Sequence, residues 1–174
     1  MNENEKYVYH GSSEPFSLAI PKRQIRSNIV DGKSMVKFDQ ISFHATPHRW
    51  IALAYTHQPK SSFELEGKKY YYNIGVSLYK NENWKKVFIY GLKSLEESLG
   101  KLYGKAGYIL TFDKSKFFHL EGLGDFEIIT KEELQPLSLE KIANPVEEMK
   151  KEGVTFELID LADPKNSNLR EFVG

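Results

Sequence analysis

The sequence predicts a single α+β domain that spans residues 1–174 and combines six or seven strands with three short helices. Three observations support this prediction. First, β-prone runs rich in Val, Ile, Phe and Tyr recur along the chain between Gly, Pro and Asn residues. Second, only three segments carry helix start or stop signals. Third, 40% of the residues are hydrophobic, enough for one core, and the length suits one domain of roughly 100–200 residues.

The first predicted strand, residues 7–9, ends at a turn-forming cluster that begins with His10. Residues 14–40 show no sustained periodicity and contain Pro and Gly, so we expect a long, irregular, basic loop there. A polar turn region is expected at residues 60–69. Further strands are expected at residues 41–43, 70–78, 86–90, 107–112, 126–130 and 154–161.

Each predicted helix has a recognisable start or end. Thr46 is expected to cap the first helix, with Pro47 at its first helical position. Ser94 and Glu97 fit a capping box for the second helix, and Gly153 stops the third. The helices are expected from residue 47 to near residues 57–59, over residues 94–102 and over residues 145–151.

The composition excludes several classes of function. The chain has no cysteine, which excludes a disulfide framework, a thiolate metal site and a cysteine nucleophile. Its 24 basic and 24 acidic residues argue against a purely electrostatic binder of nucleic acid or membrane. Residues 1–6 are polar, unlike a signal peptide, and no apolar run approaches the ~20 residues of a membrane span. We therefore expect a cytoplasmic protein without membrane contact.

The neutral total hides an uneven distribution of charge along the chain. Residues 1–120 carry 18 basic and 11 acidic residues, whereas residues 121–174 carry 6 basic and 13 acidic residues. The first part therefore has a net charge of +7 and the second a net charge of −7. We expect two opposed surfaces that meet at one cleft.

Three pieces of the sequence carry side chains with useful chemistry, and the first is the strand end at His10, Gly11 and Ser12. A glycine lets the backbone approach a planar ligand closely. An imidazole and a hydroxyl beside it can exchange hydrogen bonds with sugar hydroxyls. An ordinary turn with a solvated histidine is the alternative interpretation.

The second piece is residues 41–55, where a strand enters a capped helix whose last turn offers the ring of Tyr55. The third is Glu127, a carboxylate within the β-prone run 126–130. Alternation along a strand places Glu127 and Ile129 on one sheet face, where partial desolvation would tune the carboxylate. An edge-strand glutamate that faces water is the alternative interpretation.

Two further patterns have structural explanations. His44 and His48 do not share a helical face, because a Thr-Pro pair separates them, so we predict no metal site from them and His57. The three tyrosines at residues 70–72 could stack on single-stranded nucleic acid. An alternating strand with Tyr71 buried explains them more simply.

Taken in order, the three pieces resemble the ADP-ribosyltransferase fold. The resemblance is greatest to the branch that contains diphtheria toxin, the poly(ADP-ribose) polymerases and the small rifampin ADP-ribosyltransferases. The first motif of that branch is a strand that ends in His-Gly-Ser or His-Gly-Thr. His10, Gly11 and Ser12 match this motif.

The second motif is a strand that runs into a helix, and Phe43, Thr46 and Tyr55 are similar to its aromatic, threonine and ring positions. The third motif is an acidic residue that opens a late strand before an exit with proline, which resembles Glu127 followed by Pro136. The resemblance implies a mostly antiparallel, split two-sheet fold with a few short helices.

The resemblance also implies NAD as a co-substrate and a role for each residue. In this family the histidine bonds a ribose of NAD and the glycine backbone holds the nicotinamide amide. An aromatic ring on the helix stacks on the nicotinamide, and the late glutamate stabilises the cationic sugar. The implied catalytic residues are therefore His10 and Glu127, and the implied NAD-binding residues are His10, Gly11, Ser12, Phe43, Thr46 and Tyr55.

One position departs from the family pattern. The second motif normally has a tyrosine at the strand end, where this chain has Ser42 or Phe43. Phe43 could supply a ring in its place, whereas Ser42 could not. Either the pocket is built differently or nicotinamide is not the ligand.

The implied function is cleavage of the nicotinamide–ribose bond of NAD, with transfer of ADP-ribose to a protein, nucleic acid, small molecule or water. The positive charge that develops on the ribose requires a fixed carboxylate in a water-poor site. Two alternatives remain open. One is a non-catalytic domain that binds a nucleotide or ADP-ribose on the same fold, and the other is an unrelated α+β interaction module.

Overall fold

Strands dominate the structure, a computed structural model that describes residues 6–30, 33–79 and 84–172. The described residues form eleven strands and three short α-helices, and the strand pairs are antiparallel except for one. The predicted class, mixed α and β structure with mostly antiparallel sheets and few short helices, is confirmed. None of the described helices is long and apolar enough to span a membrane.

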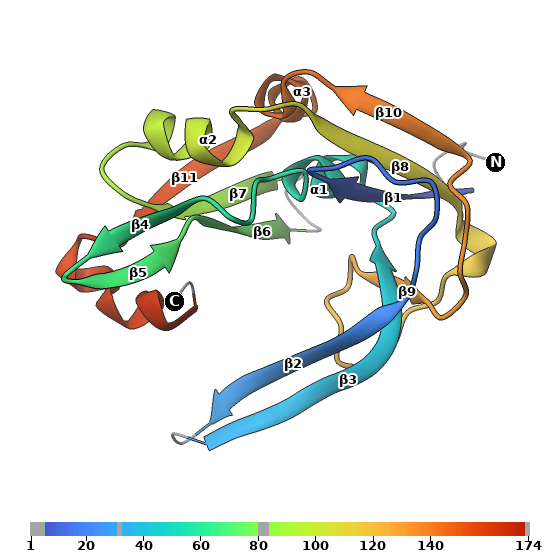
Figure 1. Cartoon of the computed structure of the whole chain (residues 1–174), viewed down its shortest axis with the longest axis horizontal. Helices are drawn as coiled ribbons and strands as arrows, with labels where there is room; N and C mark the ends of the chain where they lie inside the picture. The colour runs from blue at the N-terminus through green and yellow to red at the C-terminus, as the bar shows by residue number, and fades with distance from the viewer. Residues whose placement is uncertain (1–5, 31–32, 80–83, 173–174) are drawn as a thin grey trace.

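The described strands form four small sheets, whereas the resemblance implies two (Figure 1). The first sheet contains β1 (Tyr7–Ser12), β8 (Gly107–Asp113) and β10 (Ser138–Ile142) in that spatial order. The second contains β11 (Val154–Asp160), β7 (Trp84–Gly91) and β6 (Asn73–Tyr79), with β11 and β7 parallel. The third contains β2 (Lys22–Val30), β3 (Lys33–Ala45) and β9 (Ile128–Thr130), and the fourth pairs β4 (Ser62–Leu65) with β5 (Lys68–Tyr71).

The helix α1 (Arg49–Ala54) lies in the hydrophobic core and packs against β1 (Figure 1). Its five residues after Arg49 are all buried. The helices α2 (Leu95–Tyr103) and α3 (Pro145–Lys151) contribute Leu102 and Met149 to the same core. Both lie where they are predicted, and the sequence therefore places two of the three helices correctly.

The start of α1 differs from the prediction. The N-cap is His48, and the hydroxyl of Thr46 accepts a hydrogen bond from the His48 backbone N–H instead of capping the helix. Thr46 is held by a backbone bridge to Tyr9, in which each residue donates its N–H to the carbonyl of the other. Because this bridge keeps Thr46 extended, the helix begins only at Arg49.

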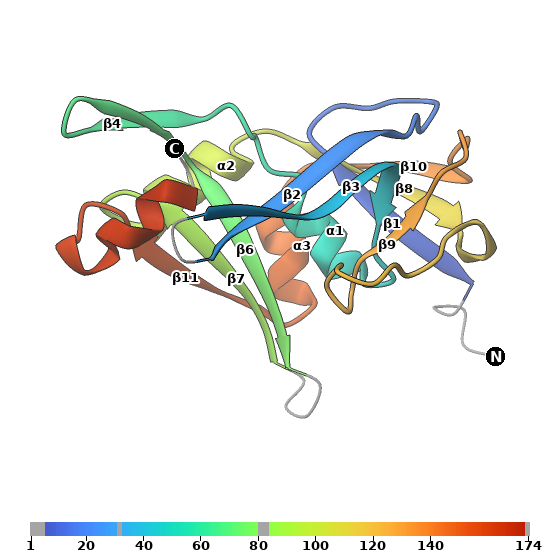
Figure 2. The ribbon, with the colours of Figure 1, turned by 90° about the horizontal axis from the view of Figure 1, so that it is seen from below.

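The prediction of an irregular loop over residues 14–40 is wrong, because most of that segment belongs to a long β-hairpin. β2 and β3 pair in antiparallel register from Lys22 opposite Ser42 outward. The hairpin projects from the body of the molecule in Figure 1, and in Figure 2, seen from below, it lies in front of the other elements. Ile25 is 56% exposed and Val36 is 62% exposed. Since large apolar residues here remain in solvent, the sequence lacks the alternation that marks a half-buried strand.

Two other parts of the sheet structure also differ from the predictions. Residues 60–69 contain β4 and the start of β5, joined by a two-residue turn with positive φ at both positions, a geometry typical of tight hairpins. Tyr70 and Tyr72 are buried and Tyr71 is 39% exposed, the reverse of the predicted alternation. β10 was not predicted, because it is an edge strand with four of its five residues exposed.

His57, which follows α1, leads to a prediction about stability in acid. Burial lowers the pKa of His57 from 6.5 to about 4. Between these two values the unfolded chain binds a proton that the folded chain excludes, so the free energy of unfolding falls as the pH drops through this window. At pH 4.5 the loss from this group is about 2–3 kcal/mol, since one pKa unit corresponds to about 1.4 kcal/mol.

Urea unfolding at pH 7 and pH 4.5 measures this loss. We expect the free energy of unfolding to fall less for His57→Gln than for the wild type, by about 2 kcal/mol. An equal fall in both proteins would show that other groups control the sensitivity to acid.

Candidate functional site

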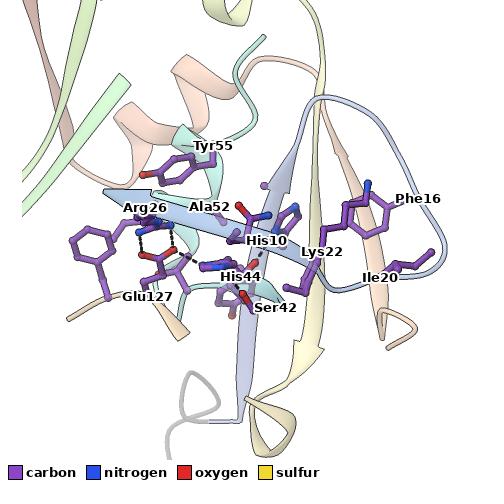
Figure 3. A pocket seen from close by; sticks show the side chains of 18 of the residues that line it. His10, Phe16, Ile20, Lys22, Arg26, Ser42, His44, Ala52, Tyr55 and Glu127 are labelled. Atoms are coloured by element: carbon purple, nitrogen blue, oxygen red, sulfur yellow. Dashed lines mark hydrogen bonds and ion pairs between the residues drawn. The ribbon is translucent and has the colours of Figure 1, made fainter. Parts of the chain in front are cut away.

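A cavity of about 560 Å³ opens between β1, α1 and the hairpin strands β2 and β3 (Figure 3). Ser12 is not among the residues that line it, and its hydroxyl instead donates to the carbonyl of Glu14 and accepts the Glu14 N–H. The cavity does bring together most of the residues singled out in the sequence. These are His10, Gly11, Phe43, Thr46, Tyr55 and Glu127.

His10 is fixed as a neutral imidazole within β1, which continues through Ser12, so the prediction of a turn that begins at His10 is wrong. Its Nδ1 lies 2.8 Å from the carbonyl oxygen of His44, and because a carbonyl only accepts, Nδ1 carries the proton. Burial lowers the pKa of His10, which keeps the ring uncharged. The ring packs on Phe43, with the two centroids 4.4 Å apart. Its Nε2 is therefore a hydrogen-bond acceptor in the wall of the cavity.

Gly11 is required by the packing of α1 against β1. A Cβ atom at this position would lie 1.8 Å from the carbonyl oxygen of Ala52, a backbone atom of α1. The same Cβ would lie 3.0 Å from the carbonyl carbon of Tyr55. The glycine thus has a structural role, because it allows α1 to lie close enough to β1 for Tyr55 to reach the cavity.

Glu127 is the one acidic residue among the described residues that line the cavity, and its carboxylate is held by several hydrogen bonds. Arg26 donates to both of its oxygens, with Nη1 2.6 Å from Oε2, and His44 Nδ1 lies 2.6 Å from Oε1 (Figure 3). The Glu127 side chain is only 15% exposed. Burial raises the pKa of Glu127, but the hydrogen bonds from His44 and Arg26 outweigh it, so that the pKa lies below its usual value. The carboxylate is therefore ionised at neutral pH.

Glu127 lies just outside the strand that was predicted to contain it. Its backbone N–H donates to the carbonyl of Gly124 at 2.9 Å, so it belongs to a turn, and β9 begins at the next residue. The prediction that Glu127 and Ile129 share a strand face is therefore wrong, because Glu127 lies outside β9. The Glu127 carboxylate is nevertheless partly buried, as the sequence analysis predicts.

His44 links Glu127 to a buried serine. The Ser42 hydroxyl lies 2.9 Å from His44 Nε2, so that Ser42, His44 and Glu127 form a hydrogen-bonded chain. This order resembles the serine, histidine and acid of hydrolytic enzymes. Ser42 is only 1% exposed, however, so its hydroxyl is positioned to support His44 and not to attack a substrate.

The histidines considered as metal ligands have other surroundings. His44 bonds Ser42 and Glu127, whereas His57 lies beyond the end of α1, beside the ring of Tyr55. Within residues 6–30, 33–79 and 84–172, no group of three His, Asp or Glu side chains is placed to hold a metal ion.

The rings of Tyr55 and Phe43 differ in how accessible they are to a ligand. Tyr55 is the C-cap of α1 and is 44% exposed, and it lies beside Arg26 at the cavity (Figure 3). Phe43 packs its ring between His10 and Phe112. Of these two aromatic residues, Tyr55 therefore has the more accessible ring.

Sequence reasoning did not identify Arg26, Ser42 or His44 as partners of Glu127. Arg26 lies in the segment predicted to be a loop, and Ser42 has no aromatic ring at a position where the resemblance predicts one. A signal was present in the spacing, since Lys22, Gln24 and Arg26 alternate at the period of a strand and all line the cavity.

The basic and acidic parts of the chain meet at several places, not at one cleft as expected. Inside the cavity the basic part supplies Arg26 and the acidic part supplies Glu127. Outside the cavity the same kind of pairing joins Arg49 to Glu140 and Glu152, Lys86 to Glu157, and Lys116 to Glu132.

Comparison of the chain with known protein families finds no match. No curated protein matches it, and no solved structure does. A proposal for its function therefore depends on the chemistry of the cavity.

Proposed function

We propose that the protein is an NAD-dependent ADP-ribosyltransferase or NAD glycohydrolase that cleaves the nicotinamide–ribose bond in this cavity. The observation that carries the proposal is the presence of His10, Tyr55 and an ionised Glu127 in the wall of one cavity. The cavity volume of about 560 Å³ also lies within the range of small-molecule sites, roughly 300–1,000 Å³.

Each side chain has a role that follows from its chemistry. The exposed ring of Tyr55 stacks on the nicotinamide ring, and His10 Nε2 accepts a hydrogen bond from a ribose hydroxyl. The Glu127 carboxylate opposes the positive charge that develops on ribose C1 as the bond to nicotinamide breaks. Nicotinamide leaves with the bonding electron pair, and the acceptor bonds to C1 and loses a proton. A protein, a nucleic acid, a small molecule or water is compatible with that step.

A second candidate is a domain that binds a nucleotide or ADP-ribose without cleaving it. The contacts of Glu127 favour this alternative, because Arg26 and His44 already occupy its two oxygens. The missing tyrosine of the second motif, in whose place this chain has Ser42 or Phe43, also favours the binding domain.

Release of nicotinamide from NAD tests the first proposal, and Tyr55→Ala tests the stacking role. We expect Tyr55→Ala to raise KM for NAD about tenfold, since an aromatic pair contributes about 0.5–1.5 kcal/mol beyond its buried area. The matched control is Tyr71→Ala, because Tyr71 is similarly exposed but lies on β5 outside the cavity lining. Its KM should equal that of the wild type.

The outcomes separate the two candidates. If ADP-ribose raises the Tm of the wild type but no nicotinamide is released, the binding domain is supported and the enzyme is not. If neither NAD nor ADP-ribose changes the Tm and no nicotinamide is released from NAD, both proposals are wrong.

A further inference from the structure

The inner face of β2 presents a row of polar side chains to the cavity. Lys22, Gln24 and Arg26 occupy alternate positions of the strand and line the cavity. Figure 3 labels Lys22 and Arg26. A strand rises ~3.3 Å per residue, so the Cα atoms of Lys22 and Arg26 lie about 13 Å apart, a distance that two long side chains can close onto one ligand group. Lys22 has no hydrogen-bond or ion-pair partner among the described residues, which leaves one cation at the cavity without an anion.

Arg26, the last residue of this row, contacts the carboxylate of Glu127. Its side chain is 48% exposed, whereas the Glu127 side chain that it contacts is 15% exposed. The guanidinium is thus the outer partner of the ion pair, and it is carried by the projecting hairpin. Glu127 also bonds His44, so the carboxylate keeps one partner if Arg26 moves away.

A guanidinium binds a carboxylate and a phosphate with the same planar, two-point geometry. We propose that Lys22, Gln24 and Arg26 form a binding site for the diphosphate of a nucleotide ligand, and that Arg26 exchanges the Glu127 carboxylate for this diphosphate when the ligand enters. The identity of the substrate rests on the function proposed above. Arg26 then has two effects: it selects a substrate with a diphosphate, and it leaves the Glu127 carboxylate free to face the ribose.

Binding of ADP-ribose, followed by calorimetry, tests the diphosphate site without requiring any activity. We expect Arg26→Gln to weaken binding about 10- to 100-fold, the range for a lost hydrogen bond to a charged group. The matched control is Arg23→Gln, because Arg23 lies on the same strand and also makes a two-point contact with a carboxylate, that of Asp39, outside this cavity. Arg23→Gln should bind ADP-ribose within twofold of the wild type. Equal affinity of Arg26→Gln and the wild type, or no binding by the wild type, overturns the proposal.

A comparison of NAD with nicotinamide riboside, which lacks the diphosphate, tests the exchange. We expect the wild type to prefer NAD, and Arg26→Gln to reduce the ratio of the two kcat/KM values at least tenfold, because the loss falls mainly on the substrate that carries the diphosphate. If Arg26→Gln slows both substrates equally, Arg26 only positions Glu127 and the exchange is wrong. If the wild type cleaves neither substrate, the proposed function fails, and the ADP-ribose measurement still decides whether the diphosphate site exists.

Discussion

Glu127→Gln is expected to lower kcat for nicotinamide release by about 10²- to 10³-fold, the cost of removing one group that stabilises transition-state charge. The substitution keeps the shape of the side chain and removes its negative charge. The charge on ribose C1 is small in the bound substrate and large in the transition state, so kcat should fall much more than KM rises. Initial rates over a range of NAD concentrations measure both parameters.

Glu132→Gln is the matched control for this experiment. Glu132 lies in the same part of the chain, but its side chain is 64% exposed and contacts Lys116 at 3.6 Å outside the cavity lining. Its kcat should equal that of the wild type. Normal turnover by a folded Glu127→Gln variant would contradict the mechanism, and circular dichroism with a thermal melt would confirm that the variant is folded.

Gly11→Ala is expected to lower the free energy of unfolding by about 3 kcal/mol or more, at the upper end of the cost of an overpacked core. The new Cβ would lie 1.8 Å from the Ala52 oxygen and 2.8 Å from the Ala52 carbonyl carbon. Both are backbone atoms of the buried helix α1, so no side-chain rotation can relieve the overlap. Urea unfolding followed by circular dichroism measures the loss.

Gly100→Ala is the control for the glycine substitution. Gly100 lies in α2, and a Cβ there would have no neighbour within 4 Å. We expect a gain of about 0.5–1 kcal/mol from the better helix propensity of alanine. If Gly11→Ala were as stable as the wild type and had lost only its affinity for NAD, the glycine would serve the ligand and not the packing of α1.

Elements whose ends depend on neighbouring residues could be predicted from the sequence. Ser94 caps α2 by accepting the Glu97 N–H, as the capping box predicts. Gly153 follows α3 with a φ of +79°, a conformation that favours glycine. Such contacts span three or four residues, so the local pattern contains the information that they need.

Elements that depend on distant partners could not be predicted in the same way. Thr46 has the composition of an N-cap, but its bridge to Tyr9 delays the helix. The strands β2 and β3 stabilise each other through pairing along an exposed hairpin, where polar and apolar residues both face solvent. These strands lack the alternation of apolar and polar residues that would predict the pairing.

The sequence by itself determined which groups are available to the candidate site, namely His10, Gly11, Tyr55 and Glu127. The tertiary structure alone decided the partners of Glu127. The pairing of β3 with β9 places His44 opposite Ile129, close to the Glu127 carboxylate, and the hairpin brings Arg26 to its other side. The physical reason is that these contacts depend on the register between strands far apart in the chain. Residue type and local spacing do not specify that register.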